Sequence, residues 1–291
     1  MNILDKVNWE KGMEITAATF IEAERYHTYR QDLNRRLLIL RSYGLVPGDQ
    51  YELESRILDN TLEITRMHCE AVSRKASLFQ LYVPLTFTLP ECEEGVYYFM
   101  VYNEGSETYD RNEISYIRPH CSYGLKQRQE LSGGDFFPLL KLVKSSSGWQ
   151  KADYIPPSVS LSAHPGLSHY YLEIKRIVDA ITAHLKEHND KIEFLLSYTA
   201  IELHFFTGNE APGELILLVK KIMKILQYNA PHFKEDMESY IAMPYDHDDC
   251  AENFEEAVKL LESYREIIMR IEVVPNPEPE PELPQEDFYN L

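Results

Sequence analysis

The sequence predicts an α+β fold in which an N-terminal β-sandwich is followed by an antiparallel helical bundle and a disordered acidic tail. Apolar residues tend to alternate before Pro156-Pro157, as they do in half-buried strands. After this point they recur at spacings of three and four, as they do on helices. The last stretch is rich in proline and glutamate. The expected domains are residues 1–162, 163–272 and 273–291.

The β half begins with an ambiguous stretch, since Ala17–Tyr43 is compatible with a helix or with a long strand. Asp59-Asn60 then separates two strand-like runs and predicts a hairpin, because both residues tolerate positive φ. Leu78–Leu89 alternates strictly and predicts one strand, with Pro84 favouring an edge position or a bulge. Further strands are expected at Val96–Tyr102, Ile114–Ile117 and Phe136–Val143.

Four helices are expected after Pro157. The first carries a heptad seam, which indicates packing against other helices and predicts a contact between chains. The seam consists of Leu167, Tyr171, Ile174, Val178, Ile181 and Leu185. Ser168 is a candidate cap for this helix. The second helix spans about Asp190–Phe206, Pro212 opens the third, and the fourth runs from about Asp249 to Ile271.

The final segment, Glu272–Leu291, contains six acidic residues and no lysine or arginine. Repeated proline prevents helices and strand ladders, and like charges extend the chain, so this tail is expected to be disordered. Its tip, Phe288, Tyr289 and Leu291, is a candidate docking motif. The alternative is a solvated tail that only keeps the protein soluble.

Composition limits the classes of function. The formal net charge of −18 over 291 residues disfavours binding to nucleic acid or to anionic lipid. No apolar run is long enough to cross a membrane, and we expect neither a signal peptide nor direct membrane insertion. Cys69, Cys92, Cys121 and Cys250 form no CxxC pair, which suits reduced thiols in a cytosol.

The densest polar cluster is the loop Tyr245–Cys250, but adjacent residues splay apart and lack the spacing typical of zinc ligands. Asp248 or Asp249 is instead expected to cap the following helix. His68-Cys69 and His120-Cys121 lack a partner across a site, and no glycine-rich phosphate loop is present. No catalytic residue, cofactor or metal is therefore predicted, although a carbohydrate-active enzyme on a β-sandwich stays open as a minor alternative.

Three stretches carry a resemblance to a known family. The first is Trp9-Glu10-Lys11-Gly12-Met13 with the later Tyr43-Gly44-Leu45-Val46-Pro47. The second runs from Phe136 to Leu142 and on into Asp153–Ala163, and the third is Met243-Pro244-Tyr245-Asp246-His247. In order and spacing these stretches resemble the TssK family, a baseplate component of bacterial type VI secretion systems.

The resemblance implies a non-enzymatic structural protein with a β shoulder like that of phage receptor-binding proteins, a helical neck and a C-terminal head. It also implies a cytoplasmic homotrimer at the inner face of the inner membrane, bound to the wedge proteins TssF and TssG. A head domain is not expected here, because only the acidic tail follows the fourth helix. Attachment to the membrane-associated complex is then expected through another route, with the tail as the candidate.

Two sets of candidate contact residues follow. The heptad seam is the candidate trimer interface. Trp9, Gly12 and Met13, with the tail tip, are the candidate partner-binding residues. The alternative function is that of a phage or phage-like tail receptor-binding protein, which shares the same architecture.

Overall fold

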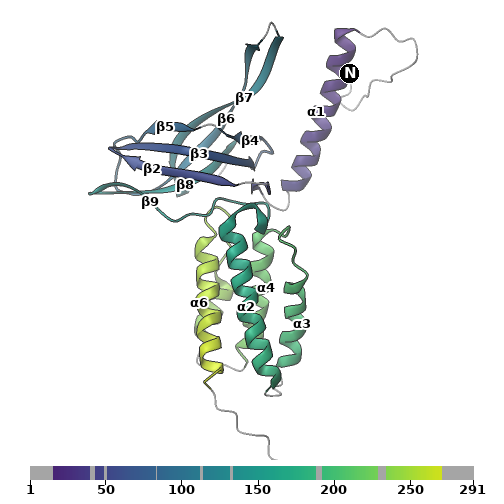
Figure 1. The fold of residues 1–291 in the computed structure, drawn as a ribbon, viewed down its shortest axis with the longest axis vertical. Coiled ribbons are helices and arrows are strands. Elements are labelled where there is room, and N and C mark those ends of the chain that lie inside the picture. Colours follow the sequence, from purple (N-terminus) through teal and green to yellow (C-terminus); the bar gives the residue numbers. More distant parts are fainter. Residues whose placement is uncertain are drawn as a thin grey trace, which may run out of the picture.

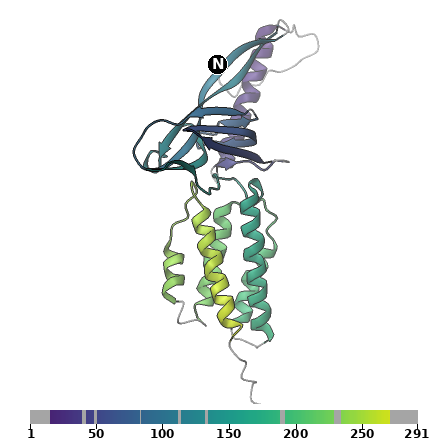
Figure 2. The same ribbon diagram turned by 60° about the vertical axis from the view of Figure 1, so that its left-hand side comes forward.

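The computed structural model describes residues 16–39, 43–48, 51–82, 84–111, 114–131, 134–187, 192–228 and 234–270. Within these ranges two antiparallel sheets are followed by a group of helices, which confirms a mixed α and β architecture (Figure 1). Before the sheets, the stretch that the sequence left undecided forms a helix, α1 (Ala17–Ile39). This helix lies beside the sheets in Figure 1, and in both views it points away from the helices that follow the sheets (Figures 1 and 2).

The first sheet is built around one long strand, β3. Its other strands all pair with β3 in antiparallel fashion. The strands are β1 (Gly44–Leu45), β2 (Glu52–Leu58), β3 (Thr61–Val72), β4 (Leu78–Leu81) and β5 (Leu85–Thr88). The predicted hairpin is confirmed, because Asp59 and Asn60 connect β2 to β3 with φ angles of 45° and 61°.

The single strand expected over Leu78–Leu89 is wrong, since the chain forms two strands, β4 and β5, on either side of Pro84. The cause includes a bulge in β3. Cys69 of β3 pairs with Leu81, and Ile64 of β3 pairs with Leu85. Between these two pairs β3 has one residue more than the segment that connects β4 to β5. The β2–β3 register shifts at the same level. A bulge of this kind bends the ladder where proline already removes a donor.

The second sheet has the order β7-β6-β8-β9. Its strands are β6 (Gly95–Arg111), β7 (Ile114–Gln127), β8 (Phe136–Ser145) and β9 (Gly148–Lys151). Strands β6 and β7 are much longer than predicted and extend as a two-stranded arm beyond the other strands (Figure 1). Their pairing continues to Arg111 opposite Ile114. The sequence pattern missed this arm because apolar alternation marks strands that cover a core, whereas a hairpin arm is held by its own ladder.

Both sheets contribute side chains to one apolar core. Its largest members include Phe79 of β4, Phe99 of β6 and Phe137 of β8, each with at most 1% of its surface exposed. The opposite face of the second sheet carries a smaller cluster with Tyr98 and Met100. This second face is the one that contacts the helical part of the chain.

Within the described ranges, five helices follow the sheets. They are α2 (Pro165–Glu187), α3 (Glu193–His204), α4 (Pro212–Leu226), α5 (Lys234–Ala242) and α6 (Ala251–Ile268). The first position of α4 is Pro212, as predicted. The expectation of four helices missed α5, which is short and in which Met237 and Tyr240 are the buried residues among Glu235–Ala242. Two short 3-10 turns are η1 (Arg128–Glu130) and η2 (Leu161–Ala163).

The heptad seam of α2 lies inside the helical core of a single chain. Five of its six members have at most 2% of their surface exposed. They are Leu167, Ile174, Val178, Ile181 and Leu185. The sixth, Tyr171, is partly buried and donates its hydroxyl to the carbonyl of Phe206 at 3.0 Å. Packing within the chain therefore accounts for the regular seam and leaves little of its surface for a second chain.

The predicted cap of α2 is wrong. The helix begins at Pro165, so Ser168 lies within its first turn. The Ser168 hydroxyl instead donates to the carbonyl of Leu161 at 3.1 Å. This bond ties the start of α2 to the segment that enters it from the second sheet.

Candidate functional site

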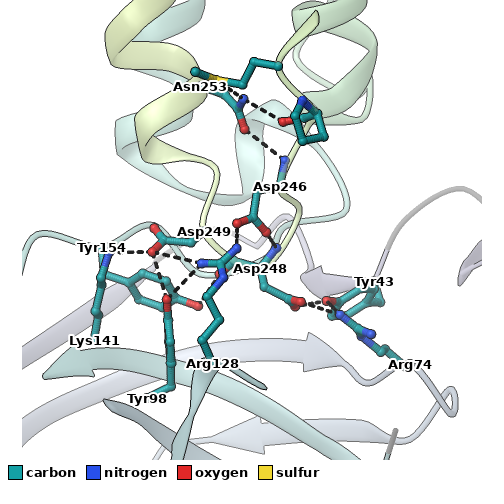
Figure 3. A network of polar contacts seen from close by, with 12 residues as sticks. Tyr43, Arg74, Tyr98, Arg128, Lys141, Tyr154, Asp246, Asp248, Asp249 and Asn253 are labelled. Carbon is teal, nitrogen blue, oxygen red and sulfur yellow. Dashed lines mark hydrogen bonds and ion pairs between the residues drawn. The ribbon is translucent and has the colours of Figure 1, made fainter. Parts of the chain in front are cut away.

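Three segments meet where the sheets contact the helices. The first two lie within sequence stretches that carry the resemblance, and the third begins with the stretch Met243–His247 and continues to Cys250. The segments are residues 43–46, 154–160 and 243–250, and we call their meeting point the joint (Figure 3). The Leu45 amide donates to the carbonyl of Pro157 at 2.7 Å, and the Val159 amide donates to the carbonyl of Leu45 at 2.9 Å. The segment that leads into the helices is thus paired with β1.

Gly44 allows this close pairing. Its φ of +123° lies in a region that residues with a side chain rarely adopt. A Cβ at this position would lie 2.0 Å from the carbonyl oxygen of Pro157. The position requires glycine for two reasons, the backbone conformation and the approach of a second backbone.

Asp249 is the most deeply placed acid of the joint. One carboxylate oxygen accepts hydrogen bonds from Lys141 Nζ at 2.5 Å and from the Tyr98 hydroxyl at 3.0 Å. Tyr98 and Lys141 are directly paired on β6 and β8, so the sheet register brings both donors to the same point. Burial and the nearby Asp249 charge raise the pKa of Tyr98 to about 12, which keeps the phenol protonated as a donor.

Asp248 binds the opposite side of the joint. Its carboxylate pairs with Arg74 Nη2 at 2.5 Å and accepts a hydrogen bond from the Tyr43 hydroxyl. The Arg74 guanidinium also lies over the Tyr43 ring, 4.7 Å from its centre. Tyr154 donates to the backbone carbonyl of Asp248 at 2.7 Å. Asp248 is therefore held by Tyr43, Arg74 and Tyr154, all of which precede α2.

His247 packs its ring against Tyr43, with 4.5 Å between the ring centres. His247 Nε2 lies 2.6 Å from the carbonyl oxygen of Tyr43. Because a carbonyl can only accept, this geometry assigns the ring proton to Nε2. Burial lowers the pKa of His247, which favours the neutral ring.

Asp246 contacts both the second sheet's end and helix α6. Its carboxylate forms an ion pair with Arg128, which lies in η1 at the end of β7. The Asp246 amide donates to Oδ1 of Asn253 at 2.9 Å, and Asn253 is almost fully buried on α6. Asn253 Nδ2 in turn donates to the carbonyl of Pro244 at 3.1 Å. One buried amide thus fixes both ends of the Pro244–Asp246 turn.

The predicted helix cap at Asp248 or Asp249 is wrong. The residue before α6 is Cys250, whose side chain makes no capping bond, and both acids turn away from the helix towards the sheets. The sequence suggested a cap because acids before a helix usually serve one. The partners of these acids, Arg74, Arg128 and Lys141, lie between 108 and 174 positions earlier in the chain, so nothing local in the sequence indicates the contacts.

The arrangement suits a mechanical role better than a chemical one. Three carboxylates meet three cationic side chains, so the joint is balanced in charge. Across the described residues, no group of histidine, cysteine, aspartate and glutamate side chains has a geometry that would hold a metal ion. Partly buried ion pairs with additional hydrogen bonds resist separation, since removal of one partner leaves the other charge without compensation. The joint can therefore hold the sheets and the helices in one orientation.

The candidate partner-binding residues Trp9, Gly12, Met13, Phe288, Tyr289 and Leu291 all lie outside the described residues. A surface that the sequence analysis missed lies on α3 and just after it. Its members are Phe194, Tyr198, Ile201 and Phe205, spaced four, three and four and each at least 50% exposed. We call them the α3 stripe. The opposite face, with Leu196 and Leu203, is buried in the helical core.

A signal for this stripe is present in the sequence. Apolar residues occur on all sides of Glu193–His204, whereas a helix at the surface of a core needs only one apolar face. Large exposed patches of this kind typically mark interaction sites. In Figure 1, α3 lies at the outer edge of the helical part.

No protein-family model matches the chain, and no curated protein matches it. Solved structures do match. TssK from the type VI secretion system of EAEC, in complex with a nanobody, is 15% identical with a TM-score of 0.62. That alignment covers 84% of this chain and 68% of the other.

Two assemblies contain a similar chain. In the TssK-TssF-TssG baseplate subcomplex of the type VI secretion system the identity is 16% and the TM-score 0.60, covering 92% of this chain and all of the other. The matching chain in the baseplate complex from the type VI secretion system is 16% identical with a TM-score of 0.60. That alignment covers 91% of this chain and all of the other. At sequence identities of 15% and 16% the structural similarity shows that the fold is shared. The chain therefore has the TssK fold.

Within the residues that the structure describes, the helices include none that is both long enough and apolar enough to span a membrane.

Proposed function

Because the chain has the TssK fold, we propose that it is a member of the TssK family and a non-enzymatic structural component of a type VI secretion baseplate. The observation that carries this proposal is the extent of the match. In both baseplate assemblies the alignment includes the sheets and the helices of this chain and covers the whole of the matching chain. Described parts of the later motifs, at Tyr43–Pro47, Asp153–Ala163 and Met243–His247, also meet at the joint, which supports a shared architecture rather than a chance likeness in one element.

The proposed domains are a β-sandwich shoulder over residues 1–162, a helical-bundle neck over residues 163–272 and a tail over residues 273–291. Two large apolar cores support two domains, one within the sheets and one within the helices, and Ile155 and Leu161 from the end of the first range also pack in the helical core. The joint lies between these cores. In this proposal it keeps the shoulder and the neck aligned, so that force applied to one is transmitted to the other.

The proposed partners are the wedge proteins TssF and TssG, and the proposed location is the cytoplasmic face of the inner membrane. Co-expression with TssF and TssG from the same organism tests the proposal. We expect the tagged chain to retain both wedge proteins through size-exclusion chromatography. Retention of neither, by a chain that is folded by circular dichroism, would contradict it.

We also propose a homotrimer in which the α3 stripe makes the contact between chains. The side chains of the heptad seam are largely buried within each chain, whereas those of the α3 stripe are exposed to solvent. The spacing of four, three and four suits a helix that packs against a helix. Light scattering tests the stoichiometry, and a monomer at micromolar concentration would contradict the proposal.

A further inference from the structure

We propose that the outer face of the first sheet carries a pocket for a basic side chain, lysine or arginine, of a partner protein. A cavity of about 300 Å³ lies between the segment that follows β1 and the strands β3 and β4. Tyr51, His68, Glu70 and Tyr82 contribute to its lining. The inference does not rest on the proposed function, because the pocket is defined by this chain alone.

Glu70 supplies the negative charge. It lies opposite Gln80 on the neighbouring strand, and Gln80 Nε2 donates to Glu70 Oε1 at 3.0 Å. The Tyr82 hydroxyl donates to the same oxygen. The bond from Tyr82, followed by that from Gln80, lowers the pKa of Glu70 below its ordinary value, so the carboxylate is ionised at neutral pH. Both bonds fall on Oε1 and leave Oε2 as an acceptor for a ligand.

Glu70 differs from other glutamates of the same sheet. Glu52 and Glu54 both pair with Arg66, and Glu63 pairs with Arg56. In contrast, no lysine or arginine is among the described residues that line the Glu70 cavity. A carboxylate that Tyr82 and Gln80 hold in place, that has only His68 as a nearby basic group, and that makes no ion pair with a described lysine or arginine attracts a cation from elsewhere.

Aromatic rings supply the second feature. The rings of His68 and Tyr82 are in contact, with 4.7 Å between their centres, and Tyr82 is 44% exposed. Tyr51 forms part of the wall. A cation beside tyrosine faces gains a favourable interaction with the ring, in addition to its bond to a carboxylate. The combination fits the ammonium of lysine or the guanidinium of arginine, each with an apolar stem.

Size and charge favour a protein side chain as the occupant. About 300 Å³ is the lower limit of ordinary ligand pockets, which suits one side chain better than a cofactor. The net charge of −18 steers basic partners towards this chain. An anchor residue that enters a pocket rimmed by aromatic surface is the usual form of an interface hot spot.

The experiment uses the full chain and three blocked pentapeptides, Gly-Gly-Xaa-Gly-Gly with lysine, arginine or glutamine at the centre. Side-chain resonances of His68 and Tyr82 are followed by NMR during titration. We expect the lysine and arginine peptides to shift these resonances saturably and the glutamine peptide to bind at least tenfold more weakly. Equal binding of all three peptides, or no binding of the basic ones, would overturn the proposal.

Two variants and a free amine complete the test. Glu70→Gln retains an oxygen for Tyr82 and Gln80 but loses the charge, and we expect it to weaken binding about tenfold. Glu94→Gln, an exposed matched control, should stay within twofold of the unaltered chain. Unchanged affinity in Glu70→Gln would refute the assigned role of the carboxylate. If spermidine binds at this site and neither basic peptide does, the occupant is a small amine and the protein-side-chain proposal is wrong.

Discussion

Gly44 shows most directly how one residue constrains this molecule. Substitution to alanine adds a Cβ at a positive φ and within 2.0 Å of the Pro157 carbonyl, so β1 must separate from the segment that enters the helices. We expect Gly44→Ala to lower the free energy of unfolding by at least about 2 kcal/mol. Urea denaturation measures the change. Gly48→Ala is the control, since a Cβ there meets nothing within 4 Å.

Asp249 provides a second test at the residue scale. Asp249→Asn keeps the shape of the side chain and removes the charge that compensates Lys141. We expect a loss of about 1–3 kcal/mol in the free energy of unfolding. Asp153→Asn replaces an exposed acid nearby and should change it by less than about 0.5 kcal/mol. Equal stability of the two variants would mean that the Lys141 pair contributes little.

His164 predicts a dependence on pH. Burial lowers its pKa to about 4, and its Nδ1 accepts a hydrogen bond from the Gly166 amide at 3.1 Å. The unfolded chain takes up a proton near pH 6.5, whereas the folded chain does so only near pH 4. Stability from this group is therefore present above pH 6.5 and is lost as the pH falls towards 4.

The matching variant is His164→Asn, whose amide oxygen can replace Nδ1 as the acceptor. We expect a smaller loss of stability between pH 7 and pH 5 in this variant than in the unaltered chain, measured from denaturation midpoints at both values. The exposed His169 serves as the control position. If His164→Asn and the unaltered chain lose stability equally, His164 is not the titrating group.

At the scale of elements, α2 and α3 separate folding from association. Ile174 is fully buried, so Ile174→Asp should place an uncompensated charge in the helical core and unfold it. Tyr198→Asp adds a charge to a side chain that is 66% exposed, so we expect a folded monomer. Circular dichroism and light scattering on both variants distinguish the two effects. A trimer that survives in Tyr198→Asp would exclude the α3 stripe as the interface.

Elements with a strong local pattern were predictable. The turn at Asp59-Asn60, the start of α4 at Pro212 and the long α2 all follow from rules that act within a few residues. The break between β4 and β5 was not predictable, because it coincides with a bulge on the partner strand β3. Helix α5 was missed because its buried residues are too few to establish a period.

The joint was predictable in its parts and not in its assembly. The sequence singled out Tyr43–Pro47, Asp153–Ala163 and Met243–His247 as separate stretches, each by its own residues. Their meeting depends on the register of β6 with β8, which sets Tyr98 beside Lys141, and on where η1 leaves Arg128. Such contacts depend on tertiary packing. The local sequence pattern, acids just before a helix, therefore predicted that Asp248 or Asp249 would cap α6.

At the scale of the whole molecule, the acidic tail gives the last prediction. Truncation after Val274 removes only residues that follow α6 and lie outside the described ranges. We expect trimers to persist and secretion to be lost, because three tails on one trimer would bind the membrane-associated complex through multivalency. Secretion assays beside light scattering test this expectation. Normal secretion by the truncated chain would leave the tail a solubilising role only.

The joint also sets an order for events during synthesis. Its bonds connect residues separated by 108, 151, 174 and 205 positions. A ribosome must therefore release the chain beyond Asp249 before the sheets can acquire their carboxylate partners. Until then Arg74, Arg128 and Lys141 lack them, and long-range contacts of this kind form slowly. We expect the nascent β half to reach its final rigidity only after Asp249 has left the ribosome.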